Sequence, residues 1–210
     1  MNFSSRQHAG QLLSQRLTQY AGADSLVLGL ARGGMVLASV VAQTLHASLD
    51  VLIVKKVTST TDPELAIGAL APEGVSSIDW KFAQRFGIDE DIINKNLLPS
   101  LREYIQEKTR LYRHRKKPID AAGKTFILVD DGIATGATMR AAVAWARKKH
   151  PQRIVVAAPL APPEFIPSLK PNVDDVVILE TPHDFRAVGQ FYDDFPQVTD
   201  EEVVELLKRR

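Results

Sequence analysis

The sequence predicts an α/β fold, a doubly wound parallel sheet of about five strands with helices on both faces. Three observations predict it. Short, continuously apolar runs alternate along the chain with segments of helical periodicity, which is the pattern of βαβ units. The length of 210 residues suits one main domain with a small appendage. A content of 45% hydrophobic and 24% charged residues is that of an ordinary globular protein and excludes general disorder.

The first quarter of the chain supplies two buried strands and two helices. Each apolar run is too short for a helix and carries no alternation, as expected of a strand that is covered on both faces. In chain order we predict a helix over 3–20 with Ser4 or Ser5 as its N-cap, a strand over 25–30, a helix over 35–46, and a strand over 50–54 that is stopped by Lys55-Lys56.

The middle of the chain departs from this alternation. Residues 57–80 contain two short apolar runs around the turn signal Pro72-Glu73-Gly74, so we expect a small flexible β-ribbon outside the main sheet. Residues 89–117 predict a long polar helical insertion, interrupted near Pro99. The basic run from Lys108 to Lys117 is interpreted as a solvated helix end, which the helix dipole favours.

The second half returns to strands and helices. We predict strands over 124–129, 153–158 and 175–179, a helix that ends at Lys149, and a last helix opened by the capping box Thr199 to Glu202. The whole of 1–210 is expected to form a single domain.

Charge and composition exclude several classes of function. Lys and Arg number 26 against 25 Asp and Glu, so no global field selects nucleic acid or a membrane surface. The absence of cysteine excludes disulfides, thiolate metal sites and cysteine nucleophiles. The apolar stretches are shorter than the ~18 residues of a membrane span, and the first residues lack the apolar core of a signal peptide. We therefore expect a soluble cytoplasmic protein with neither membrane nor nucleic acid as a partner.

The most informative stretch is 126–138, where four apolar residues end in two acids and a Thr-Gly-Ala-Thr loop opens a helix. Asp130 and Asp131 stand at the carboxyl end of a central strand, where open α/β sheets bind ligands, and carboxylates suit the vicinal hydroxyls of a sugar. The loop 134–138 presents backbone N–H groups and hydroxyls at a helix N-terminus, which suits a phosphate monoester. Together they predict a sugar-phosphate site. The spacing matches neither a Walker A loop nor a dinucleotide fingerprint.

Residues 126–138 resemble the phosphoribosyl-diphosphate (PRPP) signature of type I phosphoribosyltransferases. The resemblance implies that Asp130 and Asp131 are catalytic residues that contact the ribose hydroxyls. It also implies that the 5′-phosphate is held by Ala134, Thr135, Gly136, Ala137 and Thr138. The order of motifs along the chain further resembles a bacterial and archaeal subgroup of that family whose acceptor base is not known.

Two further segments match the family in position. The loop Ala31-Arg32-Gly33-Gly34 resembles its pyrophosphate loop, which often holds a cis peptide outside proline; we place that bond at Ala31-Arg32. Lys55 and Lys56 resemble the basic pair of that family, which reaches the leaving pyrophosphate. The resemblance therefore implies that Arg32 and Lys56 are catalytic residues as well. For the two lysines, a solvated strand end is the alternative interpretation. The resemblance also implies a type I phosphoribosyltransferase-like fold, a loop at 57–80 that closes over the site, Mg²⁺ held by substrate and water near the two acids, and a homodimer.

Residues 180–210 resemble the C-terminal hood of the hypoxanthine-guanine enzymes. This resemblance implies that Phe185 stacks on the base and that either Asp193 or Asp194 contacts the edge of the base. The alternatives are packing within the hood for Phe185 and a solvent-exposed surface position for the two acids. Two departures count against a purine. Ala134 stands where those enzymes have an acidic residue, and 158–162 lack their lysine.

Two functions from different classes follow. The first is a Mg²⁺-dependent transferase that joins PRPP to a nitrogen base or runs the reverse reaction. The second is a non-catalytic sensor of PRPP or nucleotide that acts as a regulatory or accessory protein. Arg32, Lys55 and Lys56 favour the enzyme, because a sensor of the 5′-phosphate alone needs no pyrophosphate site.

Overall fold

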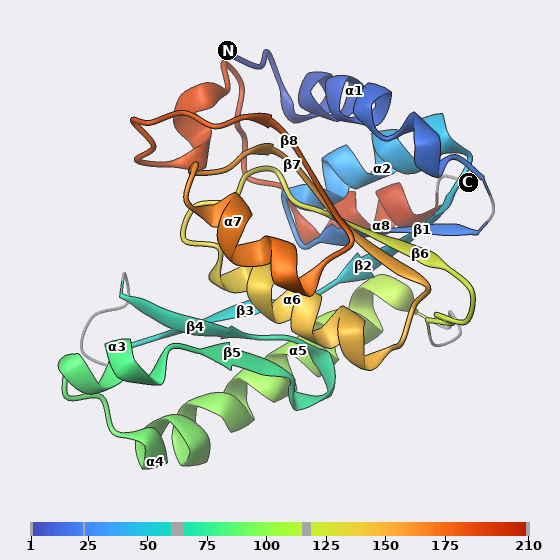
Figure 1. Ribbon diagram of the computed structural model, residues 1–210. Coiled ribbons are helices and arrows are strands. Elements are labelled where there is room, and N and C mark those ends of the chain that lie inside the picture. Colours follow the sequence, from blue (N-terminus) through green and yellow to red (C-terminus); the bar gives the residue numbers. More distant parts are fainter. Residues whose placement is uncertain (1, 23, 60–64, 115–118, 209–210) are drawn as a thin grey trace.

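The computed structural model describes residues 2–22, 24–59, 65–114 and 119–208 (Figure 1). The main sheet has five strands in the order β2-β1-β6-β7-β8, and every neighbouring pair is parallel. The strands are β1 Ser25–Leu30, β2 Ser48–Leu52, β6 Thr125–Val129, β7 Arg153–Leu160 and β8 Asp175–Glu180. The predicted parallel sheet of about five strands is confirmed.

Helices cover both faces of this sheet (Figure 1). One face carries α1 and α2, and the other carries α6 and α7. Because successive strand residues point to opposite faces, Val27 packs toward α1 and α2 while its neighbours Leu26 and Leu28 pack toward α6. Every residue of β1 is therefore buried, which explains its unbroken apolar run. The four helices are α1 Arg6–Arg16, capped by Ser5 as one of the two expected residues, α2 Gly34–Leu45, α6 Ala137–Lys148 and α7 Phe165–Leu169.

The strand order reverses between β1 and β6. From β1 the chain crosses through α2 to β2 on one side, and it later returns to β6 on the other side. Ligands of open α/β sheets bind at such a switch point, outside the carboxyl ends of the strands. The loops that follow β1 and β6 are those at 31–34 and 130–138, so the topology brings the two strongest sequence motifs to one place.

A separate antiparallel sheet, β3-β4-β5, packs against α6. Its strands are β3 Lys55–Thr58, β4 Ala66–Leu70 and β5 Ser76–Ile78, with the predicted turn as the 3₁₀ helix η2 Pro72–Gly74. The expected ribbon is thus confirmed, with two differences in detail. Lys55 and Lys56 begin β3 rather than only stopping β2, and the ribbon ends early because Asp79 caps the short helix α3 Trp80–Arg85. Residues 60–64 of the predicted loop lie outside the described residues.

The helical insertion runs from α4 Glu90–Ile92 through the π-helical turn η3 Ile93–Leu97 into α5 Leu98–Arg113. Pro99 lies in the first turn of α5, where helices tolerate a residue without a backbone N–H. The predicted interruption is therefore the π-helical turn η3, which directly precedes α5. The interpretation of 108–117 as a solvated helix end is wrong for two residues. Lys108 is paired with Asp200, and Arg113 lies 2.9 Å from Asp50, because α5 packs against β2 and the last helix. Residues 115–117 of that run lie outside the described residues.

The predicted hood contains two parts. Residues 181–198, with the 3₁₀ helix η5 Val188–Phe191, lie over the end of β6, and Phe3 forms a parallel bridge with Tyr192. The last helix, α8 Asp200–Lys208, instead packs against α2 and α5. Its predicted capping box is present, since the Thr199 N–H donates to the Glu202 carboxylate at 2.7 Å and the Glu202 N–H donates to Thr199 Oγ1 at 3.2 Å. In the ranges that the structure describes, no helix is both long and apolar enough to cross a membrane.

Candidate functional site

Two acids form the centre of the site, at the carboxyl end of β6. The Asp130 carboxylate accepts a hydrogen bond of 2.9 Å from the backbone N–H of Asp131. Burial raises the pKa of Asp130 well above its usual range, and the neighbouring charge of Asp131 raises it further, while the charge of Lys56 acts in the opposite direction. Ionisation of Asp130 therefore costs free energy, which a nearby cation or cationic substrate would offset.

The loop after β1 lies directly against these acids. A Cβ atom on Gly33 would lie 1.9 Å from Asp131 Oδ2, and one on Gly34 would lie 2.6 Å from the carbonyl oxygen of Val129. Only glycine fits at such a close approach. The peptide bond between Ala31 and Arg32 is cis, as the resemblance implied. Loop 31–34 and the acids thus form one site, although they are about 100 residues apart in the sequence.

The loop 134–138 forms the other wall. Gly136 has a φ of 75°, a left-handed conformation that permits the sharp entry into α6. Arg140 Nη2 donates to the carbonyl oxygen of Thr135 at 2.8 Å and so fixes the loop from within the helix. The first N–H groups of a helix have no partner inside the helix and carry its positive dipole end. The loop therefore offers an anion seat next to the acids.

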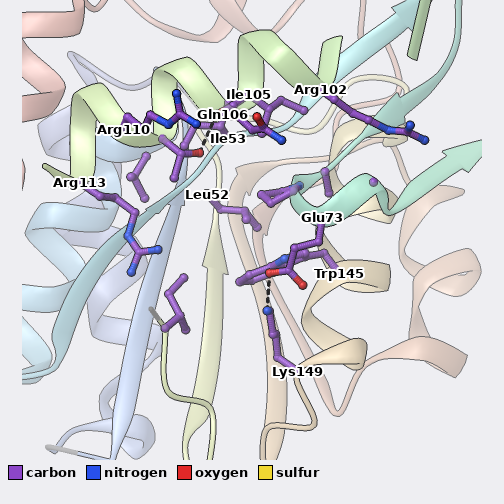
Figure 2. Close-up of a pocket in the computed structure, with 16 residues that line it drawn as sticks. Leu52, Ile53, Glu73, Arg102, Ile105, Gln106, Arg110, Arg113, Trp145 and Lys149 are labelled. Carbon is purple, nitrogen blue, oxygen red and sulfur yellow. Dashed lines mark hydrogen bonds and ion pairs between the residues drawn. The ribbon is translucent and has the colours of Figure 1, made fainter. Parts of the chain in front are cut away.

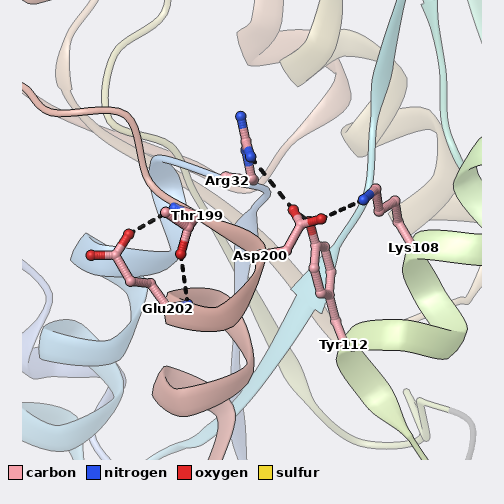
Figure 3. A network of polar contacts seen from close by, with 6 residues as sticks. All are labelled: Arg32, Lys108, Tyr112, Thr199, Asp200 and Glu202. Carbon is pink, nitrogen blue, oxygen red and sulfur yellow. Dashed lines mark hydrogen bonds and ion pairs between the residues drawn. The ribbon is translucent and has the colours of Figure 1, made fainter.

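Arg32 is held by a network from two distant helices, shown in Figure 3. Its Nη1 lies 3.5 Å from Asp200 Oδ1, at the start of α8. Lys108 of α5 pairs with the same carboxylate, and the Tyr112 hydroxyl donates to it at 2.6 Å. The pKa of Asp200 is lowered, mainly by the hydrogen bond from Lys108 and to a smaller extent by that from Tyr112. The pKa of Tyr112 is raised, mainly by burial and to a smaller extent by its hydrogen bond to Asp200. Asp200 is thus ionised and positions Arg32.

Lys55 and Lys56 are both exposed at the start of β3. Lys55 Nζ lies 4.7 Å from the ring centroid of Tyr104, and Lys108 Nζ lies 5.7 Å from the same ring. Neighbouring strand residues point in opposite directions, and the charge of Lys56 acts on Asp130. The lysine pair therefore extends from the acids to the insertion helix α5, which the sequence did not connect with the site.

Arg6, at the start of α1, pairs with the second acid. Its Nε lies 2.8 Å from Asp131 Oδ2, its Nη1 donates to the carbonyl oxygen of Pro196 at 2.6 Å, and its guanidinium lies 3.6 Å from the ring centroid of Phe195. The Tyr192 hydroxyl donates to the backbone carbonyl of Asp131 at 2.7 Å. The N-terminal helix and the hood thereby meet at Asp131.

The three acceptor candidates lie on the hood. The Phe185 ring packs against Phe191, with centroids 5.4 Å apart. The Asp193 carboxylate accepts a hydrogen bond of 2.8 Å from the side chain of Asn2, and Asp194 is exposed. The structure brings together the acids, the loops 31–34 and 134–138 and Lys56. Phe185 and Asp193 instead contact Phe191 and Asn2, respectively.

Sequence reasoning missed several residues of the site. No local signal marks Arg6, Tyr112 or Arg140, because their roles arise from contacts between distant elements. Asp200 is a partial exception, since the capping box places it in the first turn of a helix, where acids are favoured. The basic run pointed to Lys108, but as a solvated residue.

Comparison with known proteins decides the family. A family model described as phosphoribosyl transferase domain matches residues 4–195, which include the acids and both loops. The chain belongs to the phosphoribosyl transferase family. A curated protein of Mycobacterium tuberculosis (strain H37Rv), named "Putative phosphoribosyl transferase Rv0571c", is 39% identical over 210 residues; the match covers 99% of this chain and 46% of that protein. The chain therefore spans about half the length of the curated relatives it matches.

Two solved structures share the fold of this chain to different degrees. The crystal structure of TT1426 from Thermus thermophilus shares 38% identity and a TM-score of 0.81, covering 99% of this chain and 98% of that one. AQ2163 from Aquifex aeolicus shares 13% identity and a TM-score of 0.52, covering 84% of this chain and 74% of that one, a likeness of fold alone. The fold of this chain, small sheet and insertion included, is thus shared with TT1426 over 99% of its length.

Proposed function

We propose that this chain transfers the 5-phosphoribosyl group of PRPP to a nitrogen base with release of pyrophosphate, or runs the reverse reaction. The observation that carries the proposal is the contact between the two loops. Gly33 and Gly34 approach Asp131 and Val129 so closely that a diphosphate on loop 31–34 and a ribose on the acids would be neighbours. A phosphate on loop 134–138 completes the shape of PRPP.

The proposed reaction breaks the bond between ribose C1 and the diphosphate oxygen and forms a bond from C1 to a base nitrogen, whose proton passes to solvent. Asp130 and Asp131 stabilise the positive charge that develops on the ribose. Arg32, Lys55 and Lys56 stabilise the departing diphosphate. Ala134, Thr135, Gly136, Ala137 and Thr138 hold the 5′-phosphate through backbone amides and hydroxyls. Closure of the loop at 57–80 would exclude water from the cation.

The site's donor set fits Mg²⁺. Asp130 and Asp131 offer the hard oxygen ligands that this ion prefers, and a cation beside Asp130 would favour the ionised form of this carboxyl. Mg²⁺ bound to the diphosphate would neutralise charge on the leaving group. In the described part of the chain no group of three or more His, Asp or Glu side chains could bind a metal by itself, so the ion would be held by substrate and water beside the two acids.

On the acceptor side, the candidates remain Phe185, Asp193 and Asp194. Because Asp193 already accepts a hydrogen bond from Asn2, the exposed Asp194 is the better candidate for a base contact. A homodimer and a location in the cytoplasm remain predictions.

The test is an assay of pyrophosphate release from PRPP and Mg²⁺ with a panel of purine, pyrimidine and other nitrogen bases. We expect release with at least one base. Asp130→Asn combined with Asp131→Asn should abolish it, while Asp91→Asn, an exposed acid of the insertion, should leave it unchanged. PRPP binding without turnover by any base would refute transfer and support the sensor. Turnover by the double variant would refute the roles of the two acids.

A further inference from the structure

Helix α5 presents two different faces to the rest of the protein. One face lines a cavity of about 650 Å³ beside β2, and Figure 2 shows Ile105 and Arg110 on it. Tyr104, Lys108 and Tyr112 recur at every fourth residue, so they share a second face. Figure 3 shows Lys108 and Tyr112 reaching the start of α8. Helix α5 also contacts β3, the strand that begins with the basic pair.

Tyr104 lies between two lysines on this second face. Lys55 Nζ is 4.7 Å from the centroid of its ring, and Lys108 Nζ is 5.7 Å from the same centroid. Both distances are within the roughly 6 Å at which the face of an aromatic ring attracts a cation. Among the residues that the structure describes, Lys55 has no carboxylate within ion-pair distance, so contact with Tyr104 is what restricts its ammonium group.

This restriction matters for a lysine that binds an anion. A lysine side chain is flexible, and the rotamer freedom that it loses on binding opposes the binding. A ring that already holds the ammonium group removes part of that cost. Tyr104 is suited to this role because its ring is 37% exposed and its backbone belongs to a helix of 16 residues that packs on β2 and α8.

The same row of side chains is connected to Arg32. Lys108 pairs with Asp200, and Asp200 Oδ1 lies 3.5 Å from Arg32 Nη1 (Figure 3). Cations from β3 and from the loop after β1 are thus tied to one face of α5. Lys55, Lys108 and Arg32 have this one carboxylate among them, so the group keeps an excess of positive charge, which suits a diphosphate.

We propose that Tyr104 is a positioning residue, which holds Lys55 where this lysine meets the departing diphosphate. The inference rests on the proposed function, because it assigns α5 a part in the leaving-group site of that reaction. The face of the ring acts here and the hydroxyl does not, so phenylalanine should replace the tyrosine whereas leucine should not. The helical insertion is thus a part of the site.

The test measures binding of pyrophosphate with Mg²⁺, and of ribose 5-phosphate, by isothermal calorimetry. In the proposed site pyrophosphate meets Lys55, whereas ribose 5-phosphate meets the acids and the loop 134–138. Tyr104→Leu should weaken pyrophosphate binding by about three- to fivefold, the effect of one exposed cation–π contact, and should leave ribose 5-phosphate binding unchanged. Tyr104→Phe should bind both ligands as the parent does. Gln106→Leu, an exposed residue on the cavity face of the same helix, is the matched control and should also leave both affinities unchanged.

Two further variants show whether Tyr104 acts through Lys55. Lys55→Met should weaken pyrophosphate binding by about tenfold, and adding Tyr104→Leu to it should cause no further loss. Thermal melts check that each variant is folded. The inference alone would be overturned by parental pyrophosphate affinity in Tyr104→Leu, by equal weakening of both ligands, by an equal loss in Tyr104→Phe, or by a further loss in the double variant. Failure of the parent to bind pyrophosphate or PRPP would overturn the proposed function together with it.

Discussion

Asp200→Asn removes the one negative charge shared by Arg32, Lys108 and Tyr112 while keeping the shape of the side chain. The pair with Arg32 is 3.5 Å long and its side chains are 36% and 23% exposed, so it contributes at most about 1 kcal/mol. The Lys108 pair is less exposed, and the Tyr112 hydroxyl loses a charged acceptor but keeps a neutral one. We expect a loss of about 1–3 kcal/mol in unfolding free energy, which lowers Tm by about 3–10 °C in a chain of this size.

This loss should depend on pH in a defined direction. The pKa of Asp200 is lowered in the folded protein, whereas the unfolded value is about 3.9. A depressed folded-state pKa gives stability that is complete above the unfolded value and is lost as the pH falls through the folded value. The difference between the parent and Asp200→Asn should therefore be the same at about pH 7 and pH 5.5, and should shrink below about pH 4.

The assay is urea unfolding followed by circular dichroism at several pH values, with Asp91→Asn as the control. Asp91 also pairs with a lysine, but its side chain is 70% exposed, so its replacement should change the unfolding free energy by less than about 0.5 kcal/mol. If the chain transfers phosphoribosyl groups, Asp200→Asn should also raise the KM for PRPP, because Arg32 loses the group that positions it. Equal stability of the two variants at neutral pH would refute the reasoning.

Three further substitutions test the acids and the loop beside them. Asp130→Asn should raise Tm at pH 7 in metal-free buffer, because burial raises the pKa of this carboxyl in the folded protein and the unfolded chain therefore loses the proton more readily. The gain should vanish below about pH 4, and a lower Tm at pH 7 would contradict it. Arg6→Met leaves the Asp131 carboxylate without its partner, so it should lower the free energy of unfolding in urea by about 2–4 kcal/mol. A loss below about 0.5 kcal/mol would contradict this expectation. Gly34→Ala places a Cβ atom 2.6 Å from the Val129 carbonyl oxygen, so it should lower the free energy of unfolding by about 1–3 kcal/mol. It should also weaken PRPP binding measured by calorimetry, and an affinity equal to that of the parent would argue against the observed loop geometry.

The sequence predicted the features that depend on neighbouring residues. The strands at 25–30 and 124–129 were predicted because a strand buried on both faces must be apolar throughout. The capping box at Thr199 and Glu202 is a pattern within four residues. The signature at 126–138 is contiguous, so the acids and the proposed phosphate loop could be located without knowledge of the fold.

The tertiary structure alone decided which side chains complete the site. Arg6 and Asp131 are 125 residues apart, and Lys108 and Asp200 are 92 residues apart. Whether a lysine or arginine on the polar side of a helix is solvated or paired depends on which elements pack against that helix. The hydrophobic periodicity of the sequence carries no information about those elements. The basic run at 108–117 therefore predicted a solvated helix end, although α8 and β2 pack against α5. Local hydrogen bonding and hydrophobic patterning determined the elements and their order, whereas the placement of charges required the packing of helices that the sequence keeps far apart.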